Sequence, residues 1–215
     1  MMKIQERKNK FRSKCLQRLK DISKQNKYSI DKKIIEKIYL LVREHHAKEV
    51  MLYLPLKLEV NLYPLIYRLR KEKINLYVPF MEGKSFRLVK YRLPLTEKKF
   101  GIKEPNDSRK FRKKSIDISI VPIVGLDCTR RRVGFGKGMY DRFFEKNKIN
   151  IKQIVFVARE LCYSKEVVTD HYDLKADMIL SAQRRQRTKY VRNSRRYRKR
   201  SAGSNHKLCM VKKFL

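Results

Sequence analysis

Cysteine is scarce in this chain of 215 residues, and no cysteines are grouped. The four cysteines are Cys15, Cys128, Cys162 and Cys209, and none forms a C-x-x-C pair with another. This spacing argues against a zinc site and against a disulfide framework. We therefore expect four reduced thiols, as is usual for a cytoplasmic protein.

Long apolar runs are also missing. No stretch approaches the roughly 20 apolar residues that a helix needs to span a bilayer. The first ten residues, MMKIQERKNK, contain no hydrophobic stretch of the kind found in a signal peptide. These absences predict a soluble, cytoplasmic protein with no membrane partner, and we expect a monomer. The chain shows neither an internal repeat nor coiled-coil heptads.

Acidic residues are outnumbered. The chain has 21 Asp plus Glu against 56 Lys plus Arg, giving a formal net charge of +35. Residues 184–215 hold 13 basic and no acidic residues, which leaves 35 − 13 = +22 on residues 1–183. This imbalance favours anionic partners. The alternatives are solvated charged faces without a function, a site for an anionic small molecule such as a nucleotide, and nucleic-acid binding.

Composition divides the chain into two parts. Residues 1–183 are long enough for one well-buried domain. Residues 184–215 show little apolar periodicity, and we expect this basic tail to lack a stable structure. Tyr190 and Tyr197 alternate with arginines in the tail, a composition that suits stacking on RNA bases. A solvated extension without a role is the other interpretation.

Hydrophobic periodicity predicts interleaved helices and strands within residues 1–183. Helical spacing covers residues 4–25, 30–46 with Ser29 as the cap, 61–71 and 139–146. Strand-like runs cover residues 50–54, 74–80, 86–91, 116–121, 154–158 and 178–180. The runs at 50–54 and 118–121 are apolar on successive residues, as in strands covered on both faces. We predict an α/β fold with three α/β/α layers and a mostly parallel central sheet.

The most informative motif is VPIVGLDCTRRRVGFGKGMYDR at residues 121–142. It matches neither G-x-x-x-x-G-K-[ST] nor G-x-G-x-x-G, so it is neither of the two common phosphate loops. Its glycines, Gly134, Gly136 and Gly138, permit positive φ and a close approach of backbone N–H groups to an anion. Lys137 adds a mobile positive charge, and Asp141 supplies a ligand for a hard cation.

The whole string resembles the signature of 5-formyltetrahydrofolate cyclo-ligases, VP-x-x-x-FD-x-x-G-x-RLG-x-G-x-GYYDR. The segment FGIKEP at residues 100–105 is similar to that family's FGI-x-EP connection. The resemblance extends from about residue 8 to residue 181. It implies an enzyme of one-carbon metabolism that uses ATP and Mg²⁺ to convert 5-formyltetrahydrofolate into 5,10-methenyltetrahydrofolate. Its small-molecule partners would be the folate and ATP, with nucleic acid possible only through the basic tail.

The resemblance also implies roles for individual residues. The family's K-x-x-x-R pattern corresponds to Lys8 and Arg12, and its acidic folate-binding residue, five positions after an apolar contact, corresponds to Glu59 after Leu54. The metal ligands correspond to Asp141 and Asp173. The implied ATP-binding set is Lys8, Arg12, Arg132, Val133, Gly134, Phe135, Gly136, Lys137, Gly138, Met139 and Tyr140, of which Arg132, Lys137 and Tyr140 are the predicted catalytic residues.

The sequence departs from the family pattern at four positions: Leu126 for Phe, Arg130 for Gly, Val133 for Leu and Met139 for Tyr. Three of these keep an apolar side chain. Arg130 differs, because a positive φ at this position would cost an arginine about 1 kcal/mol or more. Two alternatives to catalysis remain: an inactive folate-binding protein, which a reshaped turn at Arg130 would permit, and a basic RNA-binding protein in which the tail carries the main function.

Overall fold

A seven-stranded sheet forms the centre of the computed structural model, which describes residues 4–98, 101–105, 115–146, 149–182 and 185–187. The strands lie in the order β12-β11-β9-β6-β1-β2-β3. Their bounds are β1 Glu49–Met51, β2 Asn75–Glu82, β3 Ser85–Lys90, β6 Ser115–Pro122, β9 Asn150–Val157, β11 Met178–Leu180 and β12 Arg185–Arg187.

Most neighbours in this sheet are parallel. The pairs β11–β9, β9–β6, β6–β1 and β1–β2 are all parallel. At the two edges, β3 and β12 run antiparallel to their neighbours. The prediction of a mostly parallel central sheet is therefore confirmed. A parallel arrangement places the carboxyl ends of the inner strands at one edge, where open α/β sheets bind their ligands.

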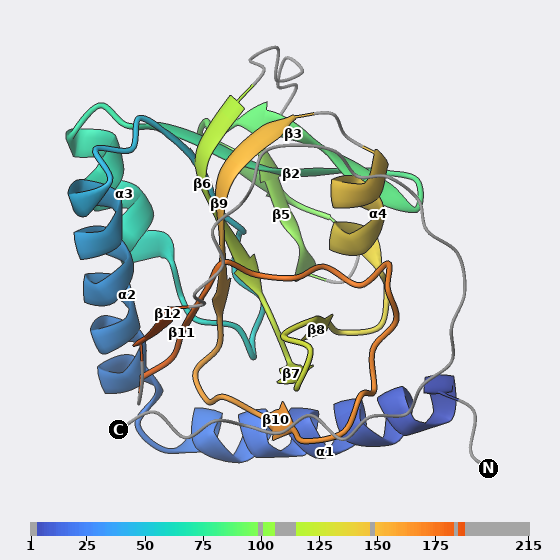
Figure 1. The fold of residues 1–215 in the computed structure, drawn as a ribbon. Helices are drawn as coiled ribbons and strands as arrows, with labels where there is room; N and C mark the ends of the chain where they lie inside the picture. Colours follow the sequence, from blue (N-terminus) through green and yellow to red (C-terminus); the bar gives the residue numbers. More distant parts are fainter. Residues whose placement is uncertain (1–3, 99–100, 106–114, 147–148, 183–184, 188–215) are drawn as a thin grey trace.

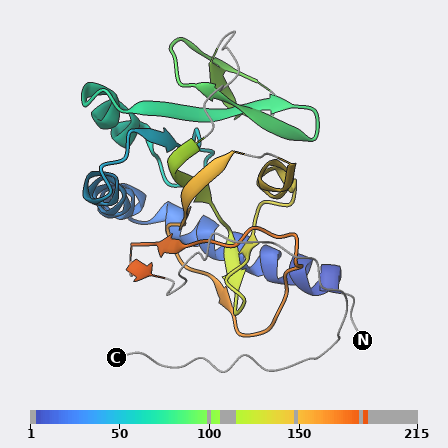
Figure 2. The same cartoon turned by 45° about the horizontal axis from the view of Figure 1, so that its top comes forward.

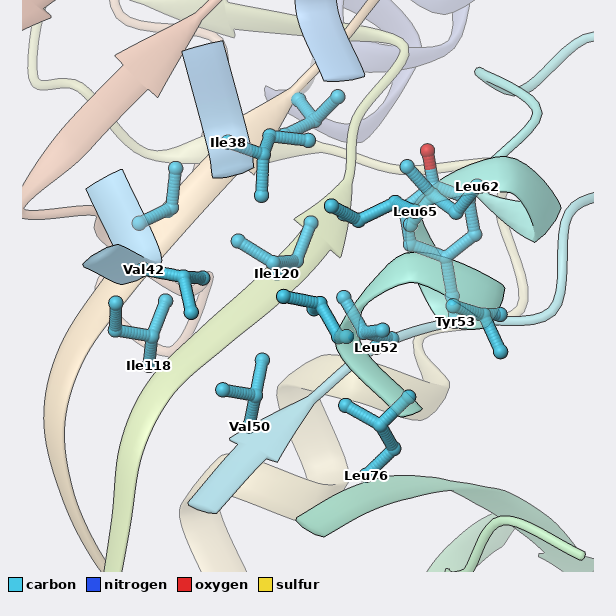
Figure 3. Packing of buried hydrophobic residues seen from close by; sticks show 14 of the residues in the cluster. Ile38, Val42, Val50, Leu52, Tyr53, Leu62, Leu65, Leu76, Ile118 and Ile120 are labelled. Carbon is cyan, nitrogen blue, oxygen red and sulfur yellow. The ribbon is translucent and has the colours of Figure 1, made fainter. Parts of the chain in front are cut away.

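Helices cover both faces of the sheet (Figure 1). Helices α2, Lys27–Glu44, and α3, Tyr63–Lys71, lie on one face, and α4, Met139–Lys146, lies on the other. Residues of β1 alternate accordingly, since Val50 packs toward α2 and α3 while Met51 packs toward α4. Figure 3 shows the apolar core between the sheet and the helices α2 and α3, in which Ile38 and Val42 of α2 lie against Ile118 and Ile120 of β6. This three-layer α/β/α arrangement confirms the predicted fold class.

Helix α1, Ile4–Lys24, lies away from the central layers, beside a small second sheet (Figures 1 and 2). That sheet has the order β10-β7-β8, with β7 Gly125–Asp127, β8 Arg132–Val133 and β10 Tyr163–Ser164. A further two-stranded sheet pairs β4, Leu95–Glu97, with β5, Lys103–Pro105. These strands have two or three residues each, too few for a recognisable alternation in the sequence.

The predicted elements match the observed ones with two informative differences. Helix α4 and strand β11 have the predicted bounds. The second helix begins at Lys27, so the prediction that Ser29 caps it is wrong; Asn26 is the N-cap and makes no side-chain cap hydrogen bond. The carboxylate of Asp31, in the same helix, is buried and pairs with Arg159.

Three residues of the basic tail, Arg185–Arg187, form β12 and extend the sheet beyond β11. The expectation for the rest of the tail falls on residues 188–215, which lie outside the described residues. Among the helices that the structure describes, none combines the length and the hydrophobicity of a membrane span.

The structure contradicts one prediction about cysteine. Cys15 and Cys162, separated by 147 residues in the sequence, form a disulfide. Cys128 takes no part in this disulfide. Scattered spacing argued against such a bond, but spacing is informative only for local pairs, and the fold brings α1 beside the segment that follows β9.

Candidate active site

A pocket of about 550 Å³ opens at the carboxyl ends of the inner strands. Tyr53 and Leu54 follow β1, Pro122 ends β6, and the segment from Phe135 to Tyr140 closes one side. The remaining lining residues are Leu56, Glu59, Pro79, Met81, Gly83, Lys84, Phe86, Ile102, Lys103, Arg132 and Arg142. The pocket therefore joins the predicted folate residues, Leu54 and Glu59, to the predicted ATP loop.

The positive φ values that the sequence allowed for the glycine loop are found at Gly136 and Gly138 but not at Gly134. Gly136 and Gly138 have φ values of +107° and +61°. Because Gly134 does not have a positive φ, backbone freedom is not the reason for a glycine at this position. A Cβ atom there would lie 2.7 Å from Nη2 of Arg132, so Gly134 provides space for that guanidinium. The loop then enters α4 directly at Met139.

Arg132 is buried at the base of this loop and pairs with Asp141. Its Nε donates to Oδ1 of Asp141 at 3.0 Å and its Nη2 donates to Oδ2 at 3.1 Å. Its guanidinium also lies 5.0 Å from the centre of the Tyr140 ring. Burial acts to raise the pKa of Asp141, but Arg132, the backbone N–H of Leu174 and the charge of Lys8 together hold it below the ordinary value. Asp141 is thus a carboxylate at neutral pH.

Lys8 and Arg12 reach the same region from α1. Nζ of Lys8 lies 2.6 and 2.5 Å from the two carboxylate oxygens of Asp173, and both side chains are buried. Arg12 donates from Nε to the carbonyl of Gly134 at 2.9 Å. Burial and the neighbouring Arg132 lower the pKa of Arg12, against the effect of both aspartates. Three cations and two carboxylates therefore form one electrostatic cluster with a net charge of +1.

The fit of this cluster to Mg²⁺ depends on phosphate. Both aspartates already accept hydrogen bonds, Asp141 from Arg132 and Leu174, and Asp173 from Lys8 and the backbone of Asp170. Within the described residues, no group of three or more His, Cys, Asp or Glu side chains is arranged to hold a metal. Mg²⁺ commonly takes one or two carboxylates together with waters and phosphate oxygens. The two aspartates fit an ion that arrives with its phosphates, not a resident ion.

Glu59 lies in the loop between β1 and α3 and lines the same pocket as Arg132 and Tyr140. Its carboxylate is 9 % exposed and accepts a hydrogen bond from the backbone N–H of Leu56 at 2.8 Å. Burial raises the pKa of Glu59 to about 7. Burial and the charge of Glu59 also raise the pKa values of Tyr53 and Tyr140, so both phenols stay protonated at neutral pH. The pocket thus contains the Glu59 carboxyl group together with two protonated phenols, of which the Tyr53 hydroxyl donates to the carbonyl of Val60 at 3.1 Å.

Similarity to known proteins agrees with this geometry. Residues 4–182 match the model of the 5-formyltetrahydrofolate cyclo-ligase family. The chain belongs to this family. It is accordingly an enzyme of the ligase class, and the predicted resemblance is confirmed.

Individual relatives cover most of the domain. A 5-formyltetrahydrofolate cyclo-ligase of Haemophilus influenzae is 30 % identical over 151 residues, which are 65 % of this chain and 79 % of the relative. One of Mycoplasma pneumoniae is 27 % identical over 81 % of this chain and 98 % of the relative. The solved structure of 5,10-methenyltetrahydrofolate synthetase from Aquifex aeolicus is 30 % identical and superimposes with a TM-score of 0.73, covering 88 % of this chain and 97 % of that one.

The residues predicted for this cyclo-ligase fall into three groups in the structure. Those that line the pocket are Leu54, Glu59, Arg132, Phe135, Lys137, Gly138, Met139 and Tyr140. Those in the adjoining charged cluster are Lys8, Arg12, Asp141 and Asp173. The remaining three residues belong to neither group. Gly134 and Gly136 lie beside Arg12 without lining the pocket. Val133 is fully buried and pairs with Gly125 in the small sheet.

Sequence reasoning missed Asp127, which shapes the turn before β8. Its side chain is fully buried and accepts hydrogen bonds from Thr129, Val168 and Thr169 at 2.6 to 3.0 Å. The turn holds Arg130 at a φ of +62°, so the condition for strain at this position is met. Asp127 also connects the turn to the segment that leads to Asp173. Its place in the family's FD pair was the signal that could have identified it.

Two arginines were also missed. Arg142 lines the pocket and donates to the carbonyls of Lys84, at 2.7 Å, and Lys137. It therefore connects the β2–β3 hairpin to the glycine loop. Arg159 follows β9 and pairs with Asp31 at 2.8 and 2.9 Å, while its Nη1 donates to Ser23. The final Arg of the motif pointed to Arg142, but no local pattern pointed to Arg159.

Proposed function

We propose that this cyclo-ligase converts 5-formyltetrahydrofolate into 5,10-methenyltetrahydrofolate, consuming ATP with Mg²⁺ and releasing ADP and phosphate. The main support is the arrangement of one pocket. Glu59 and Leu54 line the same cavity as Arg132 and Lys137. A folate bound by the first pair would therefore present its formyl group to a phosphate bound by the second pair.

The reaction needs ATP because an amide oxygen is a poor leaving group. The formyl oxygen attacks the γ-phosphorus, and the bond to ADP breaks. The second folate nitrogen then adds to the activated carbon, loses its proton, and displaces phosphate to give the methenyl bridge. Such chemistry depends mainly on positioning the reactants and on neutralising phosphate charge.

The charged cluster supplies that neutralisation. Arg132 and Lys137 are proposed to contact the transferred phosphate, and Tyr140 can donate a hydrogen bond because its phenol stays protonated. Lys8 and Arg12 lie beyond them on α1, in contact with Asp173 and the loop carbonyl of Gly134. Preorganised cations of this kind act most strongly where water is excluded.

Asp141 and Asp173 are the residues proposed to hold Mg²⁺, together with phosphate oxygens. The ion would offset phosphate charge and fix the orientation of the nucleotide. Asp141 is paired with Arg132 and Asp173 with Lys8 before the nucleotide arrives. Binding can then exchange these ion pairs for new ones, with Arg132 and Lys8 turning toward the phosphates.

Glu59 is proposed to bind the amino-pyrimidine edge of the folate. A carboxylate accepts two parallel hydrogen bonds from neighbouring N–H groups. The backbone N–H of Leu56 holds one carboxylate oxygen and fixes the direction of the group. Leu54 and Leu56 provide apolar contacts on either side of the same loop.

The direct test is to follow methenyltetrahydrofolate absorbance from 5-formyltetrahydrofolate, with ATP and Mg²⁺ added or withheld. We expect turnover only with all three components, and turnover unchanged in a chain that ends at Arg187. No turnover from pure folded protein would refute the proposal. Folate binding without turnover would favour the inactive alternative, and activity lost with residues 188–215 would point to a role for the tail.

A further inference from the structure

Four residues form one stripe along α1. Lys8, Arg12, Cys15 and Leu19 are spaced by four, three and four residues, which places them on the same side of a helix. Lys8, Cys15 and Leu19 are the buried residues of α1. The stripe therefore carries Lys8 and Arg12, the cations proposed to bind phosphate, at one end. Cys15, which forms the disulfide, lies one turn further along the helix.

The disulfide is the centre of a small apolar cluster between α1 and the glycine loop. Cys15, Leu19, Val124 and Cys162 are buried in it, with Phe11, Leu16 and Phe135 packed around them. The contact with β7 is close, since a Cβ atom on Gly125 would lie 2.9 Å from the Phe11 ring and 3.0 Å from the Cys15 sulfur. Phe135 belongs to the ATP loop itself, so the disulfide lies directly behind that loop.

In the first half of this stripe, the polar contacts with the rest of the protein are made by Lys8 and Arg12. These are the contacts that a bound nucleotide would disturb. Lys8 is bonded to Asp173 and Arg12 to the carbonyl of Gly134. Arg18 pairs with Glu160 at the exposed side of the helix, where ion pairs contribute little. If Lys8 and Arg12 turn toward phosphates, the covalent link from Cys15 to Cys162 still holds α1 in place.

We propose that Cys15 and Cys162 form a redox-controlled modification site that sets the affinity for ATP. This inference rests on the proposed function. In the disulfide form, α1 is fixed and presents Lys8 and Arg12 to the phosphates. In the dithiol form, α1 keeps only its non-covalent contacts, such as the apolar cluster and the hydrogen bond from Arg159 to Ser23, so part of the ATP binding free energy is needed to hold the helix in place.

The chemical step is thiol–disulfide exchange with a dithiol. One thiolate of the dithiol attacks a sulfur of the Cys15–Cys162 bond, and its second thiol releases the mixed disulfide. Two cysteine thiols and one oxidised dithiol result, so electrons and protons balance. Cys15 and Cys162 are 0 % and 3 % exposed. Exchange therefore requires α1 to lift from β7 first.

Thermodynamic linkage between ATP binding and the disulfide gives the size of the expected effect. If the disulfide form binds ATP more tightly than the dithiol form, bound ATP must favour the disulfide by the same factor. Couplings of this kind amount to about fivefold or more in affinity. AMP, which lacks the β- and γ-phosphates, should produce a smaller effect.

The test uses the full-length chain with Cys128→Ser and Cys209→Ser, which leaves one cysteine pair. Mass spectrometry and thiol counting establish the redox form. Titration calorimetry then measures the Kd for ATP in each form, and we expect the disulfide form to bind about fivefold or more tightly. A Cys15→Ser/Cys162→Ser chain should match the dithiol form. Equal affinities, or failure of the disulfide to form with oxidised glutathione, would overturn the proposal.

Two further measurements separate this inference from the proposed function. At a fixed ratio of reduced to oxidised dithiothreitol, ATP should raise the fraction of disulfide, and AMP should do so less. Hydrogen exchange in residues 4–24 should become faster on reduction. If neither form binds ATP, the proposed function fails and this inference fails with it. If both forms bind ATP and turn over substrate, but with equal affinity and with unchanged hydrogen exchange in α1, only the redox proposal is overturned.

Discussion

Arg132 and Asp141 form a two-point ion pair, with Nε to Oδ1 at 3.0 Å and Nη2 to Oδ2 at 3.1 Å. The pair connects β8 to the first turn of α4, so it closes the glycine loop at its base. Both side chains are largely buried, and such charge-assisted contacts are stronger than neutral hydrogen bonds. The same two residues are proposed to contact phosphate and Mg²⁺, so in that proposal the pair both stabilises the loop and takes part in catalysis.

Asp141→Asn is expected to lower kcat/KM by roughly a hundredfold or more, because the variant loses a proposed metal ligand and leaves Arg132 without its counter-ion. Steady-state rates across a Mg²⁺ titration will measure the loss. Asp21→Asn, on the exposed side of α1, is the matched control and should retain wild-type rates. A wild-type Mg²⁺ dependence in Asp141→Asn would exclude this residue as a metal ligand.

Arg130→Gly is expected to stabilise the protein by about 1 kcal/mol, since Arg130 has a φ of +62°, where a side chain is disfavoured. Denaturant unfolding will measure the change. Lys73→Gly, at a φ of +58° outside the pocket, is the matched control and should stabilise by a similar amount. A KM for ATP that changes with Arg130→Gly, and not with Lys73→Gly, would assign the turn an effect on the site.

The buried carboxyl of Glu59 is expected to make stability depend on pH. Burial raises its pKa from 4.5 to about 7, so the folded state binds more protons than the unfolded state in this range. The free energy of unfolding should therefore fall as pH rises from about 4.5 to about 7. Denaturant unfolding at pH 5 and pH 8 should show a smaller decrease for Glu59→Gln than for wild type. Equal decreases would contradict the shift, and Glu36→Gln on the surface serves as the control.

Removing one partner of the Asp31–Arg159 pair is expected to be costly. Both side chains are buried, and Arg159→Met would leave the Asp31 carboxylate uncompensated, with a loss of about 3 to 5 kcal/mol. Adding Asp31→Leu should recover much of that loss, because the charge is removed as well. Thermal unfolding of Arg159→Met, Asp31→Leu and the double variant will test this. Losses that simply add would show that the two charges do not interact.

Several features of this protein could be obtained from the sequence alone. The period of apolar residues identified all four α-helices of the described residues and the inner strands, because a helix or strand displays its buried face at regular intervals. The 121–142 motif identified the glycine loop and the family. The positive φ at Gly136 and Gly138 is a property of the local backbone, so the glycines could be recognised in the sequence. Apolar periodicity and the need for glycine depend only on neighbouring residues, so both can be recognised in a short segment of sequence.

Other features were decided by the tertiary structure. Lys8 meets Asp173 across 165 positions, Asp31 meets Arg159 across 128, and Cys15 meets Cys162 across 147. No spacing rule connects such pairs, because their distance depends on the order of strands in the sheet and on where α1 crosses the small sheet. The sequence by itself determined the elements and the loop chemistry. Only the packed sheet determined which charges and cysteines meet, because the carboxyl ends of its parallel strands bring distant segments to one edge.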